Sequence, residues 1–377
     1  MATVSSFDPL SSDVIQSEAW DVIQLRRNTT DVPDGPTGLQ TLALQGSWRA
    51  VVERTIAYRN APIDDLLIGA AWHIFALTKL RQYGNAADEL ASLGPLDSPQ
   101  DTQEGPRGPS SKVPFALRWL QAVLPYLLGK QKEAVERTYD LMEFCRMQVE
   151  KLACGADAQS IGDSTPEEDS ARLQLAELWN RRQEMVVAML VGHHTRAREY
   201  VVALRWLGWM LERRKRDVQL LSKIGYVQLV LGDLRAAAAS FQDVIKAVAA
   251  LGPEATPPDR RLVRRNQGLL LFAEQDYKGA EAEFDVVLRE DPGDYIAANN
   301  KSICRMYACN LPGAVQSLEA ALQANPQSFL QETVLLNLCS MYELSSSTAS
   351  TESKRRLTAW ASRVGPEDFD LSIFRPA

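Results

Sequence analysis

The sequence has little that would support β-structure, a metal site or catalysis by histidine. Aromatic residues make up 7% of the 377 residues, and the chain holds 3 histidines and 5 cysteines. Runs of β-branched residues, which favour strands, are few, whereas alanine and leucine, which favour helices, are abundant. The cysteine number is odd and no CxxC pair occurs, so we expect small buried thiols in a reducing compartment. These features together predict an all-α fold.

Long hydrophobic runs and a secretion signal are also missing. No stretch approaches the roughly 20 apolar residues that cross a bilayer as a helix. The first five residues lack the basic and then apolar pattern of a signal peptide. The net charge of -7 and the pI near 5.3 disfavour a general nucleic-acid binder, which would carry a basic excess. We therefore expect a cytoplasmic protein that neither binds nucleic acid nor inserts into a membrane.

Motifs of catalysis are absent as well. The chain has no HExxH, no GxSxG and no glycine-rich loop after a strand. His73 stands in an apolar stretch and is expected in the core rather than at a metal. His193 and His194 follow Gly192, and we expect them to be solvated in a repeat turn. The sequence thus predicts a protein without enzymatic activity, cofactor or metal.

What the sequence does contain is a repeat. Glu199 and Asp233, like Ala203 and Ala237, are separated by 34 residues, and the same spacing recurs further along the chain. One interval, between Asp233 and Asp276, is 43 residues, because nine extra residues precede the next repeat near a proline-rich loop. A helix–turn–helix unit of 34 residues is typical of tetratricopeptide repeats.

Each recurring position has a physical role in such a unit. A small alanine lets the second helix approach the first, and a large apolar residue four positions later fills the same seam. An acidic or amide residue caps the second helix, a proline ends it, and glycine allows close helix contact. The predicted signature comprises Ala203, Leu207, Gly225, Asp233, Ala237, Phe241, Gly268, Asp276, Ala280, Phe284, Pro292, Ala314, Leu318 and Pro326.

The pattern predicts one solenoid, a right-handed superhelix of helical hairpins, over residues 37–365. Polar stretches without apolar periodicity predict loops at 94–112 and 154–167. Residues 1–36 are expected to form a disordered tail, and residues 366–377 a C-terminal tail. A Ser/Thr-rich linker is expected at 345–351, before the last helix.

Candidate partner-binding residues lie mainly on predicted first helices. Basic side chains at a helix start oppose the helix dipole, so another interaction must favour the cluster at 260–265. The basic cluster either forms a solvated face or binds an acidic segment of a partner. The candidate set is Arg261, Arg264, Arg265 and Asn300, with Trp360 in the last helix as a cap or docking residue. A clamp for acidic chaperone tails would need further polar positions, where this chain has Leu330 and Val334.

Beyond the generic repeat, three segments resemble one family. They read GYVQLVLGDLRAAAASF at 225–241, DPGDYIAANN at 291–300 and ETVLLNLCSMYEL at 332–344. A further match, GPSSKVPFALRWL, lies at 108–120, outside the repeat consensus. From about residue 40 to Phe374 the sequence is similar to subunit 12 of the TRAPP vesicle-tethering complex.

The resemblance implies a non-catalytic scaffold in transport from the endoplasmic reticulum to the Golgi. It implies other large TRAPP subunits as partners and, indirectly through the complex, a Rab-type GTPase. It further implies a cytoplasmic protein held peripherally at Golgi or intermediate membranes. The alternatives are a tetratricopeptide adaptor for chaperone tails and another transport scaffold.

Overall fold

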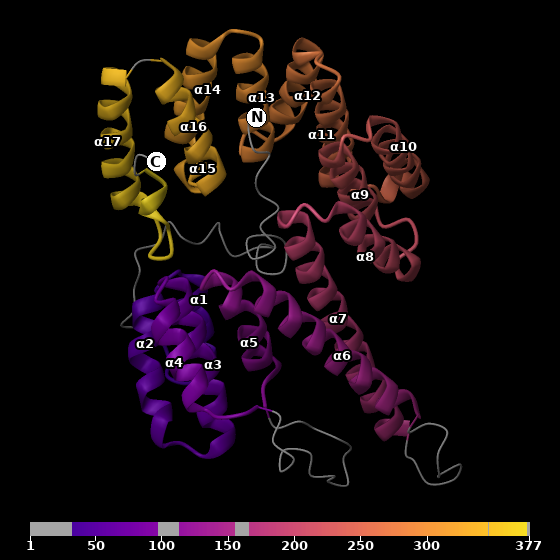
Figure 1. Cartoon of the computed structure of the whole chain (residues 1–377), viewed down its shortest axis with the longest axis vertical. Helices are drawn as coiled ribbons and strands as arrows, with labels where there is room; N and C mark the ends of the chain where they lie inside the picture. The colour runs from indigo at the N-terminus through magenta and orange to yellow at the C-terminus, as the bar shows by residue number, and fades with distance from the viewer. Residues whose placement is uncertain (1–31, 97–112, 155–165, 346, 375–377) are drawn as a thin grey trace. The chain divides into compact units, whose positions relative to one another are not determined.

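The computed structural model describes residues 32–96, 113–154, 166–345 and 347–374, and over these residues the chain forms helices and no strand. The all-α, tetratricopeptide-type fold class expected from the sequence is confirmed. The chain divides into two compact units (Figure 1). Of the described residues, those from 32 to 193 and Pro366–Asp368 form the N-terminal unit, and those of His194–Gly365 with 369–374 form the C-terminal unit. None of the described helices is both long and apolar enough to cross a bilayer.

The N-terminal unit is built from helices that pair in chain order, with α1 on α2, α3 on α4 and α5 on α6. Two of them are long, at 24 residues for α6 and 31 residues for α7. The helices are α1 (Pro36–Leu44), α2 (Trp48–Thr55), α3 (Ile63–Lys79), α4 (Tyr83–Ser92), α5 (Phe115–Leu127), α6 (Gln131–Cys154) and α7 (Pro166–Arg196), with a 3-10 turn η2 (Ile56–Asn60) after α2.

The C-terminal unit continues with shorter and more regular hairpins (Figure 1). Its pairs are α9 with α10, α11 with α12 and α13 with α14, and each pair also contacts the next along the chain. The helices are α8 (Tyr200–Arg213), α9 (Val218–Leu231), α10 (Leu234–Leu251), α11 (Pro257–Ala273), α12 (Tyr277–Glu290), α13 (Tyr295–Tyr307), α14 (Leu311–Ala324), α15 (Pro326–Phe329), α16 (Glu332–Ser345) and α17 (Ser347–Val364). Two 3-10 turns, η4 (Gly252–Glu254) and η5 (Leu371–Phe374), complete it.

The nine extra residues of the long repeat have two uses. They extend α10 to 18 residues, against 14 for the equivalent helix α12. The remainder forms η4 and leads to Thr256, whose side chain and that of Asp259 form a reciprocal capping box at the start of α11. The insertion therefore leaves the packing frame of the following repeat intact.

The prediction of a Ser/Thr-rich linker at 345–351 is wrong, because the described residues on either side of position 346 are helical. Ser345 ends α16, and α17 begins already at Ser347. Serine and threonine are acceptable at a helix start, where their hydroxyls compete least with the helical hydrogen bonds. Most of the loops predicted at 94–112 and 154–167, and of the tail at 1–36, lies outside the described residues. In the predicted tail 366–377, Phe374 of η5 is buried.

Candidate functional site

The seam of the hairpins is formed by the residues of the predicted signature. The four alanines at 203, 237, 280 and 314 are buried, and so are the large residues one turn later at 207, 241, 284 and 318. A Cβ atom on Gly225 would lie 2.4 Å from the Phe241 ring, and one on Gly268 would lie 2.8 Å from the Phe284 ring. These two glycines therefore provide the space in which the phenylalanine rings lie.

The turns between paired helices are closed by side-chain caps. Asp233 accepts a hydrogen bond from the Ala236 amide at 2.9 Å, and Asp276 accepts one from the Gly279 amide at 2.9 Å. Asn310 begins α14 in the same way. Glu199 occupies the equivalent position before α8 without a side-chain cap. Pro292 follows the end of α12, and Pro326 is the first residue of the short helix α15.

Two arginines at the start of α11 are held by carboxylates of the turn between α12 and α13. Arg261 lies 3.2 Å from Asp291, and Arg265 lies 3.7 Å from Asp294, which begins α13. Arg264 pairs with a glutamate of α12, at 3.2 Å from Glu283. These pairs supply the interaction that offsets the helix dipole at this position. Arg265 thus joins adjacent repeats, and a partner would compete with these internal carboxylates.

Of the three candidate arginines, Arg264 is the most accessible to a partner, since 53% of its side chain is exposed, against 19% for Arg261 and 21% for Arg265. One face of α13 is also accessible and mixed in character. It carries the exposed side chains of Ile296 and Tyr307 and the half-buried Asn300 between them. We call these three residues the α13 face. A surface that combines apolar, aromatic and amide groups suits contact with a protein.

A line of polar contacts between first helices was not predicted from the sequence. Ser222 of α9 donates to Asn266 of α11 at 2.9 Å, and Asn337 of α16 donates to Asn299 of α13 at 2.9 Å. Both Ser222 and Asn266 are buried. Polar residues that recur on the inner side of successive first helices could have indicated these hydrogen bonds. The pairing of the side chains depends on helix packing, which the sequence spacing alone does not define.

Trp360 lies half-buried on α17 and packs against the last hydrophobic cluster of the C-terminal unit. That cluster includes Leu318 of α14, Leu335 of α16 and Phe329 of α15. The helix α17 therefore covers the end of the repeat stack, and Trp360 contributes to this cover as well as offering part of its ring to the surface.

The histidines differ from expectation. His193 and His194 are each 6% exposed, so the prediction that they are solvated is wrong. They belong to the last turns of α7, which continues past Gly192 to Arg196. The ring of His193 packs 5.2 Å from that of Tyr126, and Nδ1 of His194 lies 2.6 Å from a carboxylate oxygen of Glu199. His73 is partly buried on α3, with 14% of its side chain exposed.

Of the four cysteines whose side chains the structure describes, three are buried as expected. Cys145, Cys304 and Cys339 are buried, whereas Cys309 is exposed in a turn with a positive φ of 63°. Burial raises the pKa of Cys145 and Cys304 to about 12 and that of Cys339 to about 11. The three buried thiols are therefore neutral and unreactive at physiological pH. Within the described part of the chain, no group of three or more His, Cys, Asp or Glu is placed to hold a metal ion.

Comparisons with known proteins agree with this architecture. The tetratricopeptide repeat family model matches residues 223–295. Trafficking protein particle complex subunit 12 of Mus musculus is 32% identical over 298 residues, which are 77% of this chain and 36% of the mouse protein. The Homo sapiens protein of the same name is 31% identical over 298 residues, covering 77% of this chain and 40% of that protein. The chain thus spans well under half the length of these relatives.

Among solved structures, a tetratricopeptide repeat protein from Parabacteroides merdae aligns with 87% of this chain and 96% of its own, at 11% identity and a TM-score of 0.43. The sequence matches extend well beyond the repeat consensus at 223–295, since they include most of both units. The chain is a tetratricopeptide-repeat protein related to subunit 12 of the trafficking protein particle complex.

Proposed function

We propose that this chain is a non-catalytic scaffold subunit of a TRAPP-type vesicle-tethering complex. It acts in transport from the endoplasmic reticulum to the Golgi, by binding other large subunits of the complex. Its association with Golgi or intermediate membranes is peripheral and mediated by those subunits. A Rab-type GTPase is reached only through the assembled complex.

The observation that carries the proposal is the 32% identity over 298 residues, because it spans both the regular repeats and the less regular N-terminal unit. Shared generic repeat positions alone would not extend so far outside the segment matched by the repeat model, 223–295. The non-catalytic role is supported by the uses of the polar groups. Helix caps and ion pairs account for most of the polar groups that the sequence singled out.

The proposed contact surface in the C-terminal unit consists of the α13 face together with Arg264. A stable contact between two subunits buries about 1,200–2,000 Å² in total, so this surface would be the centre of a larger interface. Trp360 at the end of the repeat stack is a second candidate contact. Aromatic residues and arginine at the centre of an interface contribute most to its affinity.

The test is affinity isolation of the full chain from cells, with mass-spectrometric quantification of the recovered proteins. We expect the other TRAPP subunits in constant ratio to the chain, and recovery of chaperones alone would refute the proposal. The variant Ile296→Asp tests the α13 face, because a carboxylate there would weaken apolar contact without entering the hairpin core. The matched control is Ile245→Asp on α10, whose side chain is exposed to a similar degree, at 37% against 39%.

A further inference from the structure

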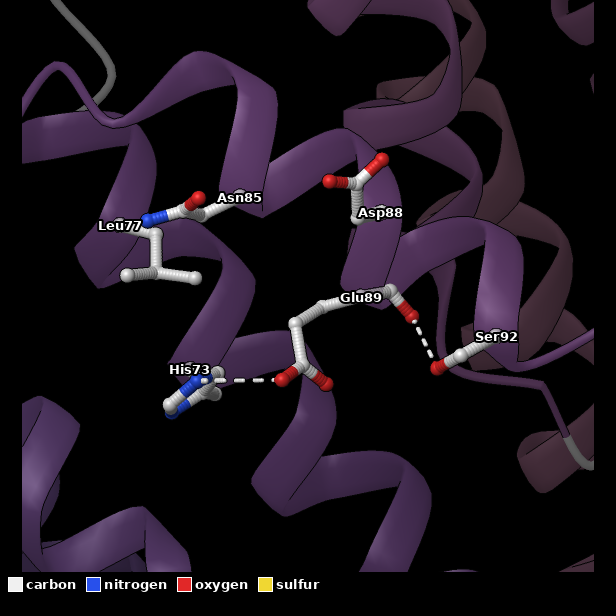
Figure 2. A pocket seen from close by; sticks show the side chains of 6 residues that line it. All are labelled: His73, Leu77, Asn85, Asp88, Glu89 and Ser92. Carbon is white, nitrogen blue, oxygen red and sulfur yellow. Dashed lines mark hydrogen bonds and ion pairs between the residues drawn. The ribbon is translucent and has the colours of Figure 1, made fainter.

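A cavity of about 370 Å³ opens between α3 and α4 of the N-terminal unit. Figure 2 shows the six side chains that line it, with Glu89 pointing toward His73. They are His73, Leu77, Asn85, Asp88, Glu89 and Ser92. Its volume is within the range of about 300–1,000 Å³ that is usual for binding pockets. None of these residues belongs to the repeat signature or to the surface proposed above.

The hydrogen bonds around His73 determine which ring nitrogen carries its proton. The Thr55 hydroxyl donates its hydrogen to the carbonyl oxygen of Val52 at 2.7 Å, so Oγ1 of Thr55 is left as an acceptor. Nδ1 of His73 lies 2.7 Å from Oγ1 of Thr55. Because this hydroxyl has no second hydrogen, Nδ1 of His73 is the donor. In the neutral ring, Nε2 is therefore an acceptor, and it lies 4.0 Å from a carboxylate oxygen of Glu89.

Other polar groups of the cavity also donate to partners outside it. The Asn85 amide nitrogen donates one of its two hydrogens to Gln82 at 3.1 Å, and the Asn85 carbonyl oxygen is an acceptor. The Ser92 hydroxyl donates to the main-chain carbonyl of Glu89 at 2.7 Å, as Figure 2 shows. Asp88 and Glu89 add two carboxylates. The cavity thus offers a set of acceptors with negative charge and an apolar wall at Leu77.

Glu89 already accepts a guanidinium at the rim, since Nη2 of Arg59 lies 2.9 Å from its Oε1. Asp88 has no ion pair or side-chain hydrogen bond to any residue that the structure describes. Burial lowers the pKa of His73 and outweighs the opposing effect of Glu89, so the imidazole is neutral at physiological pH and adds no positive charge. The charges facing the cavity are therefore two carboxylates and one arginine, so one negative charge is not balanced.

We propose that this pocket binds an arginine side chain of a partner polypeptide. A guanidinium has five N–H donors in one plane and no acceptor, which complements acceptors arriving from both α3 and α4. Its aliphatic stem would pack on Leu77. Lysine supplies the charge but concentrates its donors at one atom, so it fits this spread of acceptors less well. A bound metal ion is not favoured, because no three potential ligands among the described residues converge.

The three histidines of the chain make the pocket measurable by NMR. The full chain carrying ¹³C-labelled histidine is titrated with N-acetyl-arginine amide, and the ring signal of His73 is identified by its loss in His73→Gln. We expect a saturable shift of that signal alone. N-acetyl-citrulline amide, which has nearly the same shape without the charge, should give none, and N-acetyl-lysine amide should bind more weakly than the arginine compound.

The variant Asp88→Asn should weaken binding of N-acetyl-arginine amide about five-fold or more, as expected for loss of one partly exposed ion pair. Asp88 is exposed, so this variant should fold normally. Asp140→Asn on α6 of the same unit, also exposed, is the control and should bind as the wild type does. Equal shifts with citrulline, tighter binding of lysine, no shift at all, or unchanged binding in Asp88→Asn would each overturn the proposal. None of these outcomes bears on whether TRAPP subunits are recovered with the chain.

Discussion

The two units of this chain form helical hairpins from the same spacing but with different side chains in the seam. In the C-terminal unit, Gly225 and Gly268 give room to Phe241 and Phe284. In the α5–α6 hairpin of the N-terminal unit, the positions equivalent to glycine and phenylalanine hold Ala122 and Thr138, each at most 1% exposed. A larger residue has replaced the glycine, and a smaller one has replaced the phenylalanine.

The Phe241 and Phe284 rings lie where a Cβ atom of Gly225 or Gly268 would stand, so the two positions share one volume. Where α13 carries Ser302 at the glycine position, α14 carries Leu318. Cores tolerate exchanges that conserve total volume far better than exchanges that add to it. The repeat is recognised from sequence where glycine meets phenylalanine, and it is harder to recognise where intermediate residues share the space.

The largest difference in stability between the units should come from shortening one side chain in the seam of each. Phe284→Ala removes a fully buried ring and should lower the free energy of unfolding by about 3–5 kcal/mol. Thr138→Ala at the equivalent position of the N-terminal unit should cost about 1 kcal/mol, because it removes only a methyl and a hydroxyl. Denaturant unfolding followed by circular dichroism measures both. Equal losses would contradict the difference in seam packing.

The shared volume can be tested within one hairpin. Gly225→Val should destabilise by about 1–3 kcal/mol, because a Cβ atom there would stand 2.4 Å from the Phe241 ring. Adding Phe241→Leu should recover part of that loss, since leucine is smaller than phenylalanine and leaves room for the valine side chain. A double-mutant cycle on unfolding free energies gives the coupling. Additive effects would show that the two positions do not share space.

The two units differ less in the stability that helix caps contribute than in the packing of the seam. Asp276 caps α12 through its side chain, whereas Gln82 before α4 makes no cap hydrogen bond. Asp276→Ala should cost about 1 kcal/mol. Gln82→Ala should change the unfolding free energy by less than about 0.5 kcal/mol, as is usual for a surface position. Thermal unfolding of both variants is the measurement, and a larger loss from Gln82→Ala would reverse this part of the comparison.

The smallest expected change concerns His73 in the N-terminal unit. Burial lowers its pKa below the ordinary 6.5, so the unfolded chain takes up this proton more readily than the folded one. This residue should therefore destabilise the fold as pH falls below about 6.5, and should add no pH dependence above about 7.5. Unfolding of wild type and His73→Gln across pH 5–8 isolates the effect. A wild type that gains stability relative to the variant in acid would contradict it.

The sequence predicts the C-terminal unit better than the N-terminal unit, for the same physical reason. Alanine, glycine and phenylalanine columns define the hairpins through a local spacing, so the spacing alone places the seam positions 203, 237, 280 and 314. It does not place the carboxylates that hold Arg261 and Arg265, because Asp291 ends α12 and Asp294 begins α13, and both contacts depend on how the helices stack. The burial of His193 was missed because α7 runs beyond the turn that Gly192 indicated.

The pocket beside His73 illustrates what sequence spacing leaves out. Asp88 and Glu89 are ordinary surface residues in the sequence, and His73 appeared to belong to the core. Their common cavity arises from the packing of α4 on α3 and from the Thr55 hydroxyl that orients the ring. Spacing within one helix therefore does not reveal a cavity that two packed helices form together.

The central claim is that the chain works through a surface of its repeats within a tethering complex. Hydrogen–deuterium exchange, compared between the free full chain and the chain in the isolated complex, tests it most directly. The account predicts slower exchange on complex formation in α11 and α13, at residues 257–273 and 295–307. Unchanged exchange over both helices in an intact complex would contradict it.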